Sequence, residues 1–163
     1  MNRHRYNPKT GFPLYSESVA DFAALATLPL PSSDTVLLLV ADFRGVSTDT
    51  ISHAANHLFA SGLSYVCVWG SDCERVNDTF DLVYVGDGSR GPDRSFISTW
   101  HANEPLDEAL WCFLQCAIPP DSDIATTTRL AVTIGSPELA ASVEHALSNV
   151  PAFVSRMLAD ETK

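Results

Sequence analysis

The sequence predicts a three-layer α/β sandwich built around a mostly parallel, five-stranded β-sheet. Continuous apolar runs such as residues 35–41 are typical of strands that are covered on both faces. Segments with helical periodicity, such as residues 47–62, follow these runs along the chain. This alternation indicates a parallel sheet with helices on both faces.

The N-terminal part of the chain is expected to be a flexible tail followed by a helix. Residues 1–15 are mostly polar and are interrupted by two prolines and a glycine, which favours a tail. Ser16 can cap a helix with Val19 and Phe22 on its apolar face, and Pro29 would end that helix.

Five short segments rich in apolar and β-branched residues are predicted to be the strands. They are residues 35–41, 63–69, 82–85, 94–100 and 129–134. The connection between the third and fourth strands is too short for a helix. Because a parallel crossover needs about a dozen residues, the fourth strand is expected to pair antiparallel or to lie at an edge.

The predicted helices are marked by their capping residues and by apolar spacing. Apolar residues repeat at helical intervals over 47–62, and Gly62 can close that helix. Ser71 or Asp72 can cap a helix that runs to Phe80. A further helix covers 104–118, and the one over 136–149 begins with a Ser-Pro pair.

Together these elements are typical of a Rossmann-like or flavodoxin-like fold. Residues 16–150 are expected to form a single domain, and residues 151–163 a C-terminal tail with a helical turn or two. No repeat or low-complexity tract suggests a second domain.

Composition excludes several classes of partner. The chain has 163 residues and a net charge of −10, and a surface of that charge repels the phosphates of DNA and RNA. The first residues do not resemble a signal peptide, and the apolar runs are too short to cross a membrane. We therefore expect an acidic cytoplasmic protein with reduced cysteines and no nucleic-acid or membrane partner.

Polar residues follow the predicted strands, where ligands bind in open α/β sheets. The candidate ligand-binding residues are Asp42, Arg44, Asp72, Asp87, Trp100 and Ser136. Three of them, Asp42, Asp72 and Asp87, are candidate ligands for a divalent metal such as Mg²⁺. The alternative is that these side chains cap helices or stabilise turns, in which case the chain needs no cofactor.

Three residues near this edge are candidates for catalysis. His101 and Glu104 follow the fourth strand and could act as acid or base. Cys73 lies near a predicted helix N-terminus, which would lower its pKa, and His101 could be its base. A buried structural role for Cys73 is the alternative.

Several motifs lose their functional interpretation in context. Residues 86–91 match G-x-G-x-x-G, but no helix opens there to receive a pyrophosphate. The only lysines are in the two tails, which excludes a Walker A loop and a Schiff base. His53 and His57 are predicted to face solvent, and Cys112 and Cys116 to be buried structural thiols.

The helix over 104–118 is apolar almost all round, so something must cover it. Either the C-terminal tail packs on it, through residues such as Phe153, or it docks a partner or a second copy. In the second case Trp111, Leu114 and Ile118 are the candidate interface residues, because large apolar side chains anchor protein interfaces.

Two segments resemble an uncharacterised bacterial family catalogued only as a domain of unknown function. They are residues 69–75, Trp-Gly-Ser-Asp-Cys-Glu-Arg, and residues 99–104, Thr-Trp-His-Ala-Asn-Glu. The resemblance covers residues 35–118 and brings no activity, cofactor or partner. It implies that the two segments belong to one feature of the fold.

The sequence favours a non-catalytic binding or protein-interaction module that self-associates. The absence of a catalytic signature and the apolar 104–118 helix both point in this direction. The alternative is a metal-dependent small hydrolase or nucleotide-handling enzyme. It would use Mg²⁺ on the carboxylates at the edge of the sheet, with His101 or Glu104 as acid or base.

Overall fold

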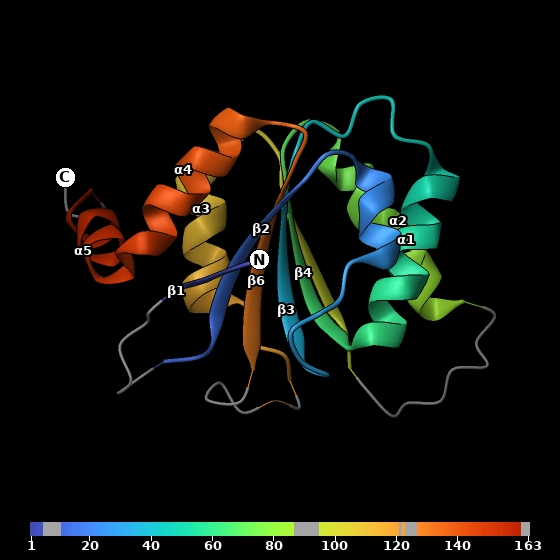
Figure 1. Ribbon diagram of the computed structural model, residues 1–163, viewed down its shortest axis with the longest axis horizontal. Helices are drawn as coiled ribbons and strands as arrows, with labels where there is room; N and C mark the ends of the chain where they lie inside the picture. The colour runs from blue at the N-terminus through green and yellow to red at the C-terminus, as the bar shows by residue number, and fades with distance from the viewer. Residues whose placement is uncertain (5–10, 87–94, 121, 123–126, 161–163) are drawn as a thin grey trace.

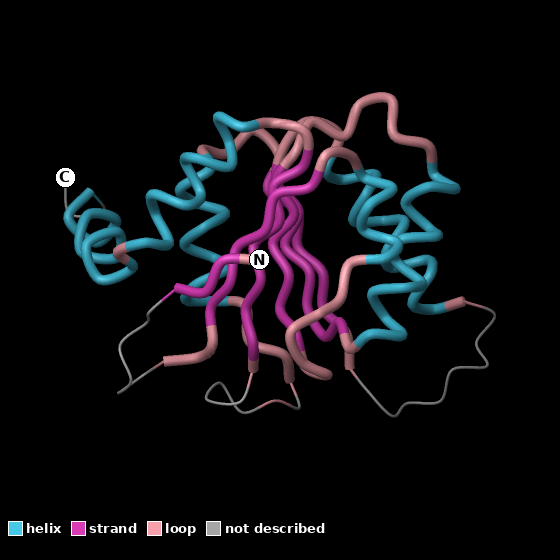
Figure 2. Tube along the Cα trace, in the orientation of Figure 1, coloured by secondary structure: helices cyan, strands magenta, loops and turns pink. Residues whose placement is uncertain are grey.

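The computed structural model describes residues 1–4, 11–86, 95–120, 122 and 127–160. One six-stranded sheet lies between two groups of helices, as Figures 1 and 2 show. The predicted three-layer α/β sandwich is therefore confirmed, with one strand more than the five expected.

The sheet is parallel except at one edge. Its strands are β1 (Asn2–His4), β2 (Leu14–Val19), β3 (Thr35–Val40), β4 (Leu63–Trp69), β5 (Ile97–His101) and β6 (Thr128–Ile134). They lie in the order β1-β2-β6-β3-β4-β5, and only β1 pairs antiparallel with its neighbour. Parallel strands end at a common edge, so the loops after β4 and β5 lie side by side.

The helices divide between the two faces of the sheet (Figure 1). One face is covered by the 3₁₀ helix η1 (Phe22–Thr27), α1 (Thr48–Ser61) and α2 (Cys73–Val85). The other face is covered by α3 (Leu106–Trp111), a π-helical turn η2 (Cys112–Cys116), α4 (Pro137–Ser148) and α5 (Val150–Asp160).

Alternation along the central strands divides the hydrophobic core in the same way. In β3, Leu37 and Leu39 pack toward α1, whereas Val36, Leu38 and Val40 pack toward α3 and α4. All five side chains are fully buried. This explains why the run reads as continuously apolar in the sequence.

Capping residues place the ends of α1 and the start of α4 where the sequence predicts them, whereas Asp72 makes no capping bond at the start of α2. Ser47 Oγ accepts from the Thr50 amide at 3.1 Å at the start of α1. Gly62 ends α1 with φ +107°, and a Cβ there would lie 2.5 Å from the Cα of Ser33. Ser136 Oγ accepts from the Leu139 amide at 3.3 Å at the start of α4.

The expectation of a flexible N-terminal tail and a helix from Ser16 is wrong. Residues 2–4 and 14–19 are strands, and β2 pairs in parallel with β6 over its whole length. Leu14 and Ser16 are buried on alternate positions, which is the period of a strand. The hydroxyl of Ser16 bonds to other elements instead of capping a helix.

The predicted strand at 82–85 is also wrong, because these residues form the last turn of α2. The apolar face of α2 continues at helical spacing through Val76, Phe80 and Val83, and a β-branched pair at its end resembles a short strand. Since α2 is a full crossover helix, β5 pairs in parallel with β4, not antiparallel. The expected edge position of β5 is confirmed.

The apolar segment at 104–118 is shorter and less regular than predicted. It begins at Leu106, changes to a π-helical turn at Cys112 and ends after Cys116. The C-terminal segment forms an eleven-residue helix, α5, and not one or two turns. Phe153 of α5 is buried in the core that also contains Phe113 and Leu114, so part of the apolar face is covered within the chain.

Candidate functional site

Two strands and a helical turn bring cysteine and histidine side chains together on one face of the sheet. Cys67 of β4 lies opposite Thr99 of β5 in the parallel register, and His101 ends β5 two residues later. Residues two apart in a strand share a face. Cys67 packs in the core that includes α3, and Thr99 and His101 lie on the same face as Cys67.

Cys112 approaches this face from a π-helical turn. The amide of Ala117 donates to the carbonyl of Cys112 at 2.8 Å, an i→i+5 bond that widens the helix. Single π-turns of this kind are often found at functional sites. Cys112 is half-buried there, and Cys116 at the other end of the turn is exposed.

The ligand atoms of Cys67, His101 and Cys112 all lie within 4.8 Å of one another. His101 Nδ1 is 2.9 Å from Glu104 Oε2, so the carboxylate holds one side of the ring. The opposite nitrogen, Nε2, is 3.4 Å from Thr99 Oγ1. We refer to Cys67, His101 and Cys112 as the thiol–imidazole cluster.

The pKa values of the two thiols in the cluster are shifted in opposite directions. A hydrogen bond from Cys67 lowers the pKa of Cys112 to about 5 against the effect of its burial, with further hydrogen bonds from His101 and Thr99. Burial raises the pKa of Cys67 well above its usual value. Cys67 is therefore a protonated donor and Cys112 a thiolate acceptor.

Cys112 also raises the pKa values of its neighbours His101 and Cys116. Burial lowers the pKa of His101, but hydrogen bonds with Cys112 and Glu104 outweigh it, so the net shift is upward. Burial and then the neighbouring Cys112 raise the pKa of Cys116. Cys112, whose pKa is lowered, thus lies beside His101, whose pKa is raised by Cys112 and by the Glu104 carboxylate.

Two segments line a pocket of about 400 Å³ beside the cluster, namely residues 69–74 after β4 and residues 101–104 after β5. The indole Nε1 of Trp69 donates to the carbonyl of Glu104 at 2.9 Å and joins them. The implication that these segments form one feature is confirmed. His101 lines this pocket and is also a member of the cluster. Glu104 lines the pocket and contacts the His101 ring.

Cys73 also lines this pocket, but its predicted reactivity is contradicted. Its side chain is buried, and burial raises its pKa where a helix N-terminus was expected to lower it. It packs with α1 and α2, in the core on the other side of the sheet from Cys67. The sequence analysis paired His101 with Cys73, whereas the structure places the His101 ring beside Cys67 and Cys112.

The carboxylates predicted to bind a metal have other partners. Asp42 makes a bidentate ion pair with Arg44, whose Nε is 2.9 Å from Asp42 Oδ1. Asp72 Oδ2 accepts from Arg75 Nε at 2.8 Å. Asp87 lies outside the described residues. Among the described residues, the cluster that can hold a metal contains no carboxylate.

Two more predicted ligand-binding residues lie apart from the cluster. Ser136 lines a separate pocket of about 310 Å³ with Gly135 and Ser18, where it caps α4. Trp100 is 47 % exposed. It lies between Thr99 and His101 in β5, so its side chain points to the opposite face of the sheet.

The predicted interface residues differ in exposure. Leu114 is buried in the chain's own core, whereas Trp111 is partly buried and Ile118 is 42 % exposed. Leu114 is therefore not available to a partner in the folded chain. Self-association through the other two stays a prediction.

Two further interpretations of paired residues had different outcomes. His53 is exposed as predicted, and His57 is partly buried, with Nε2 3.0 Å from the carbonyl of Leu28. The interpretation of Cys112 and Cys116 as buried thiols is wrong for the exposed Cys116. The helical pattern predicts a regular turn there, and the π-turn alters which side chains face the sheet.

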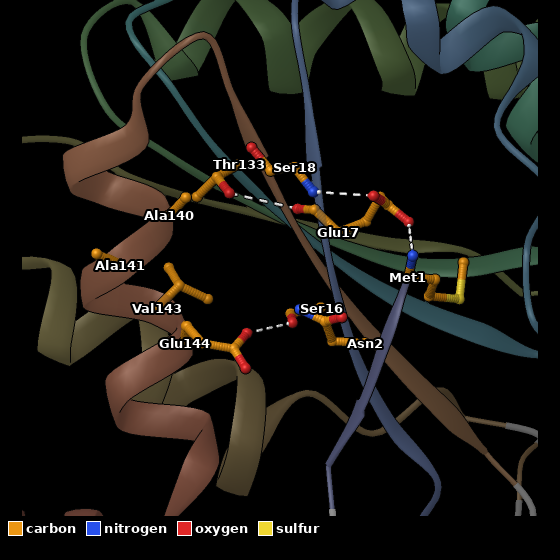
Figure 3. A pocket seen from close by; sticks show the side chains of 10 residues that line it. All are labelled: Met1, Asn2, Ser16, Glu17, Ser18, Thr133, Ala140, Ala141, Val143 and Glu144. Atoms are coloured by element: carbon orange, nitrogen blue, oxygen red, sulfur yellow. Dashed lines mark hydrogen bonds and ion pairs between the residues drawn. The ribbon is translucent and has the colours of Figure 1, made fainter.

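A third pocket, of about 320 Å³, lies between β2 and α4 (Figure 3). Ser16 Oγ donates to Glu144 Oε2 at 2.7 Å and is 2.8 Å from His4 Nε2. Thr133 Oγ1 donates to the carbonyl of Glu17 at 3.3 Å. These bonds join β1, β2, β6 and α4, so the polar groups hold the N-terminal strands to the domain.

Comparison with known proteins places the chain in a family. No described helix has the length and apolar character needed to cross a membrane. Neither the curated proteins nor the solved structures include a match to this chain. The model of a family described as a domain of unknown function, DUF7684, matches residues 17–150, which include the cluster and the pocket beside it. The chain therefore belongs to the DUF7684 family.

Proposed function

We propose that this chain is a metal-binding domain that holds a thiophilic ion such as Zn²⁺ through Cys67, His101 and Cys112. The convergence of two sulfurs and one imidazole nitrogen within 4.8 Å carries the proposal. Ligand atoms around tetrahedral zinc, at about 2.0–2.3 Å from the metal, lie roughly 3.3–3.8 Å from one another. Side-chain shifts of about 1 Å would close the site.

The type of ligand argues for zinc over magnesium. Thiolate and imidazole ligands suit zinc and copper, whereas Mg²⁺ prefers oxygen. Two thiolates neutralise a dication, so a half-buried complex would carry no net charge from the metal and its sulfurs. Cys67, which is a protonated thiol without metal, would lose its proton on binding.

His101 is oriented as metal-binding histidines usually are. A ligating histidine almost always gives its second ring N–H to a carboxylate, carbonyl or water. The Glu104 carboxylate, 2.9 Å from Nδ1, occupies that position and leaves Nε2 on the side of the sulfurs. This supports a ligand role for Nε2.

A binding role is better supported than the alternative of a carboxylate-dependent hydrolase. Asp42 and Asp72 are each paired with an arginine, which competes with a cation for their oxygens. Three protein ligands with an open fourth position are also found in catalytic zinc sites. The open position makes metal-assisted hydrolysis the second proposal, with the pocket beside His101 as the place for a substrate.

The proposal is tested by metal titration of the reduced, chelator-treated chain. Zn²⁺ is expected to bind in a 1:1 ratio, and Co²⁺ to give the absorption of a tetrahedral thiolate complex. At free zinc a hundredfold above Kd, binding stabilises the fold by about 2.7 kcal/mol and raises Tm. Mg²⁺ is expected to leave Tm unchanged.

Two matched variants separate ligand loss from loss of folding. Cys67→Ser removes a proposed ligand, whereas Cys73→Ser changes an equally buried thiol on the other face of the sheet. Cobalt absorption should be lost in the first variant and kept in the second. Equal zinc binding by both variants, or no binding by the native chain, would overturn the proposal.

A further inference from the structure

We propose that Cys112 and Cys116 are a peroxide-reactive pair that forms a disulfide and thereby empties the metal site. The release of metal rests on the proposed zinc function, whereas the formation of the disulfide does not. The oxidant is a small hydroperoxide such as hydrogen peroxide.

The position of the two cysteines at the ends of η2 supports this pairing. Cys112 and Cys116 occupy the first and last positions of η2, and their side chains lie near enough for Cys112 to raise the pKa of Cys116. Helical neighbours four apart have Cβ atoms about 5–6 Å apart, and a disulfide needs about 3.5–4.5 Å. The Cβ atoms of the two cysteines must therefore approach each other by about 1–2 Å.

The η2 turn lies at the C-terminal end of its helix. η2 is five residues long, and the helix ends at Ala117, with Pro119 and Pro120 following. The backbone after Cys116 is therefore not held by a continuing helix. Leu110, before the turn, and Phe113, within it, are buried in the core and anchor this part of the chain.

Exposure decides which thiols an oxidant can use. Cys67 is fully buried, Cys112 is half-buried, and Cys116 is exposed. A peroxide arriving from solvent meets the η2 pair first, while Cys67 is shielded by the sheet. Oxidation of a cysteine requires access to the oxidant, so the η2 pair is the favoured site.

The reaction has two balanced steps. The Cys112 sulfur attacks the outer oxygen of the hydroperoxide, the O–O bond breaks, and an S–O bond forms with loss of an alcohol or water. The Cys116 sulfur then attacks the Cys112 sulfur and displaces hydroxide, which takes the Cys116 proton and leaves as water. Two thiols are oxidised by two electrons, and the hydroperoxide is reduced by two.

Loss of the metal follows from loss of a charged ligand. A disulfide sulfur is neutral and a poor ligand, so only Cys67 and His101 would remain of the three proposed ligands. A reducing thiol restores both cysteines and the site. The two ends of η2 would thus link the oxidation state to metal occupancy.

The test uses the full chain loaded with zinc and treated with hydrogen peroxide. Zinc in solution is followed with a chromogenic chelator, and the disulfide by mass and peptide mapping. We expect a Cys112–Cys116 disulfide, release of zinc in step with it, and rebinding after dithiothreitol. A Cys67–Cys112 disulfide instead would overturn the proposal.

Cys116→Ser is the decisive variant because it keeps all three proposed ligands. Its zinc release by peroxide should be slower by about tenfold, because Cys116 can no longer resolve the oxidised Cys112. Cys73→Ser should behave like the native chain. Release at the native rate from Cys116→Ser would show that this thiol has no part in the process.

The metal-free chain separates this inference from the proposed function. If it forms the Cys112–Cys116 disulfide but no zinc ever binds, the metal function and the release step both fail, and the reactive pair stands. If zinc binds and peroxide leaves both thiols reduced, the reactive pair fails and the metal function stands.

Discussion

His101 Nδ1 lies 2.9 Å from Glu104 Oε2, which joins the last residue of β5 to the turn before α3. The carboxylate is half-exposed, whereas the imidazole is buried. A buried ring held from one side presents its other nitrogen in a defined direction. The position of Nε2 near the two sulfurs therefore depends on a residue outside the cluster.

Replacing Glu104 with glutamine is expected to weaken zinc binding by about 10–100-fold without unfolding the chain. The amide keeps the shape of the side chain but removes the charge that stabilises the imidazole as a ligand. Competition with a chelator of known affinity measures the change. Glu108→Gln is the control, because Glu108 is exposed on α3. An equal effect of both variants would contradict a positioning role for Glu104.

Asp42 is expected to titrate far below an ordinary aspartate. Hydrogen bonds from the side chain and amide of Arg44 lower the pKa of Asp42 from 3.8 to about 2. Because the folded pKa is depressed, any stability gained from the charged form is present above pH 4. It is lost as the pH falls through about 2.

Carboxyl carbon shifts in NMR spectra, recorded against pH, measure this titration. The variant Arg44→Met should return Asp42 to an ordinary pKa of about 3.9. Arg156→Met removes a distant arginine, on α5, and should change nothing at Asp42. An ordinary pKa of Asp42 in the native chain would show that the ion pair does not persist in solution.

Gly70, which ends β4 beside the pocket, is expected to tolerate no side chain. Its φ is +128°, and a Cβ would lie 1.7 Å from the carbonyl oxygen of Ala41. Gly70→Ala should lower the free energy of unfolding by about 3 kcal/mol or more, from backbone strain and overlap together. Urea unfolding measures the loss.

Gly45→Ala is the matched control for Gly70→Ala. Its φ is +84°, but no atom lies within 4 Å of the Cβ position. Only the conformational cost of about 1–2 kcal/mol should therefore appear. The difference between the two variants isolates the contact with Ala41, and equal losses would show that the ends of β3 and β4 move apart easily.

Phe153 is expected to contribute most of the free energy with which α5 packs on the domain. It is 4 % exposed, and Phe153→Ala should lower the free energy of unfolding by about 3–5 kcal/mol. Leu158→Ala, at a position on the same helix that is 49 % exposed, should change it by about 0.5 kcal/mol. Urea unfolding gives both values, and light scattering shows whether uncovering the α3 face produces association.

Local patterns were enough for the central strands and for two of the helices. The apolar runs of β3, β4 and β6 are too long and too continuous for loops. They must be buried on both faces of a sheet whatever the identity of the neighbouring strands. The caps of α1 and α4 act within one turn, so neighbouring residues suffice to place them. His101 and Glu104 were predicted at the C-terminal edge of the sheet, where they lie, because the residues that form β5 could be recognised locally.

The sequence by itself determined the layered α/β architecture, the buried runs and the acidic surface, because these depend on residue type and local spacing. Only the tertiary structure decided that Cys67, His101 and Cys112 meet. Their convergence requires β4 beside β5 and a π-turn at Cys112, and both depend on long-range packing. Reading 82–85 as a strand ended the predicted helix too early and placed a false strand between β4 and β5 in the chain, so their parallel pairing was not predicted.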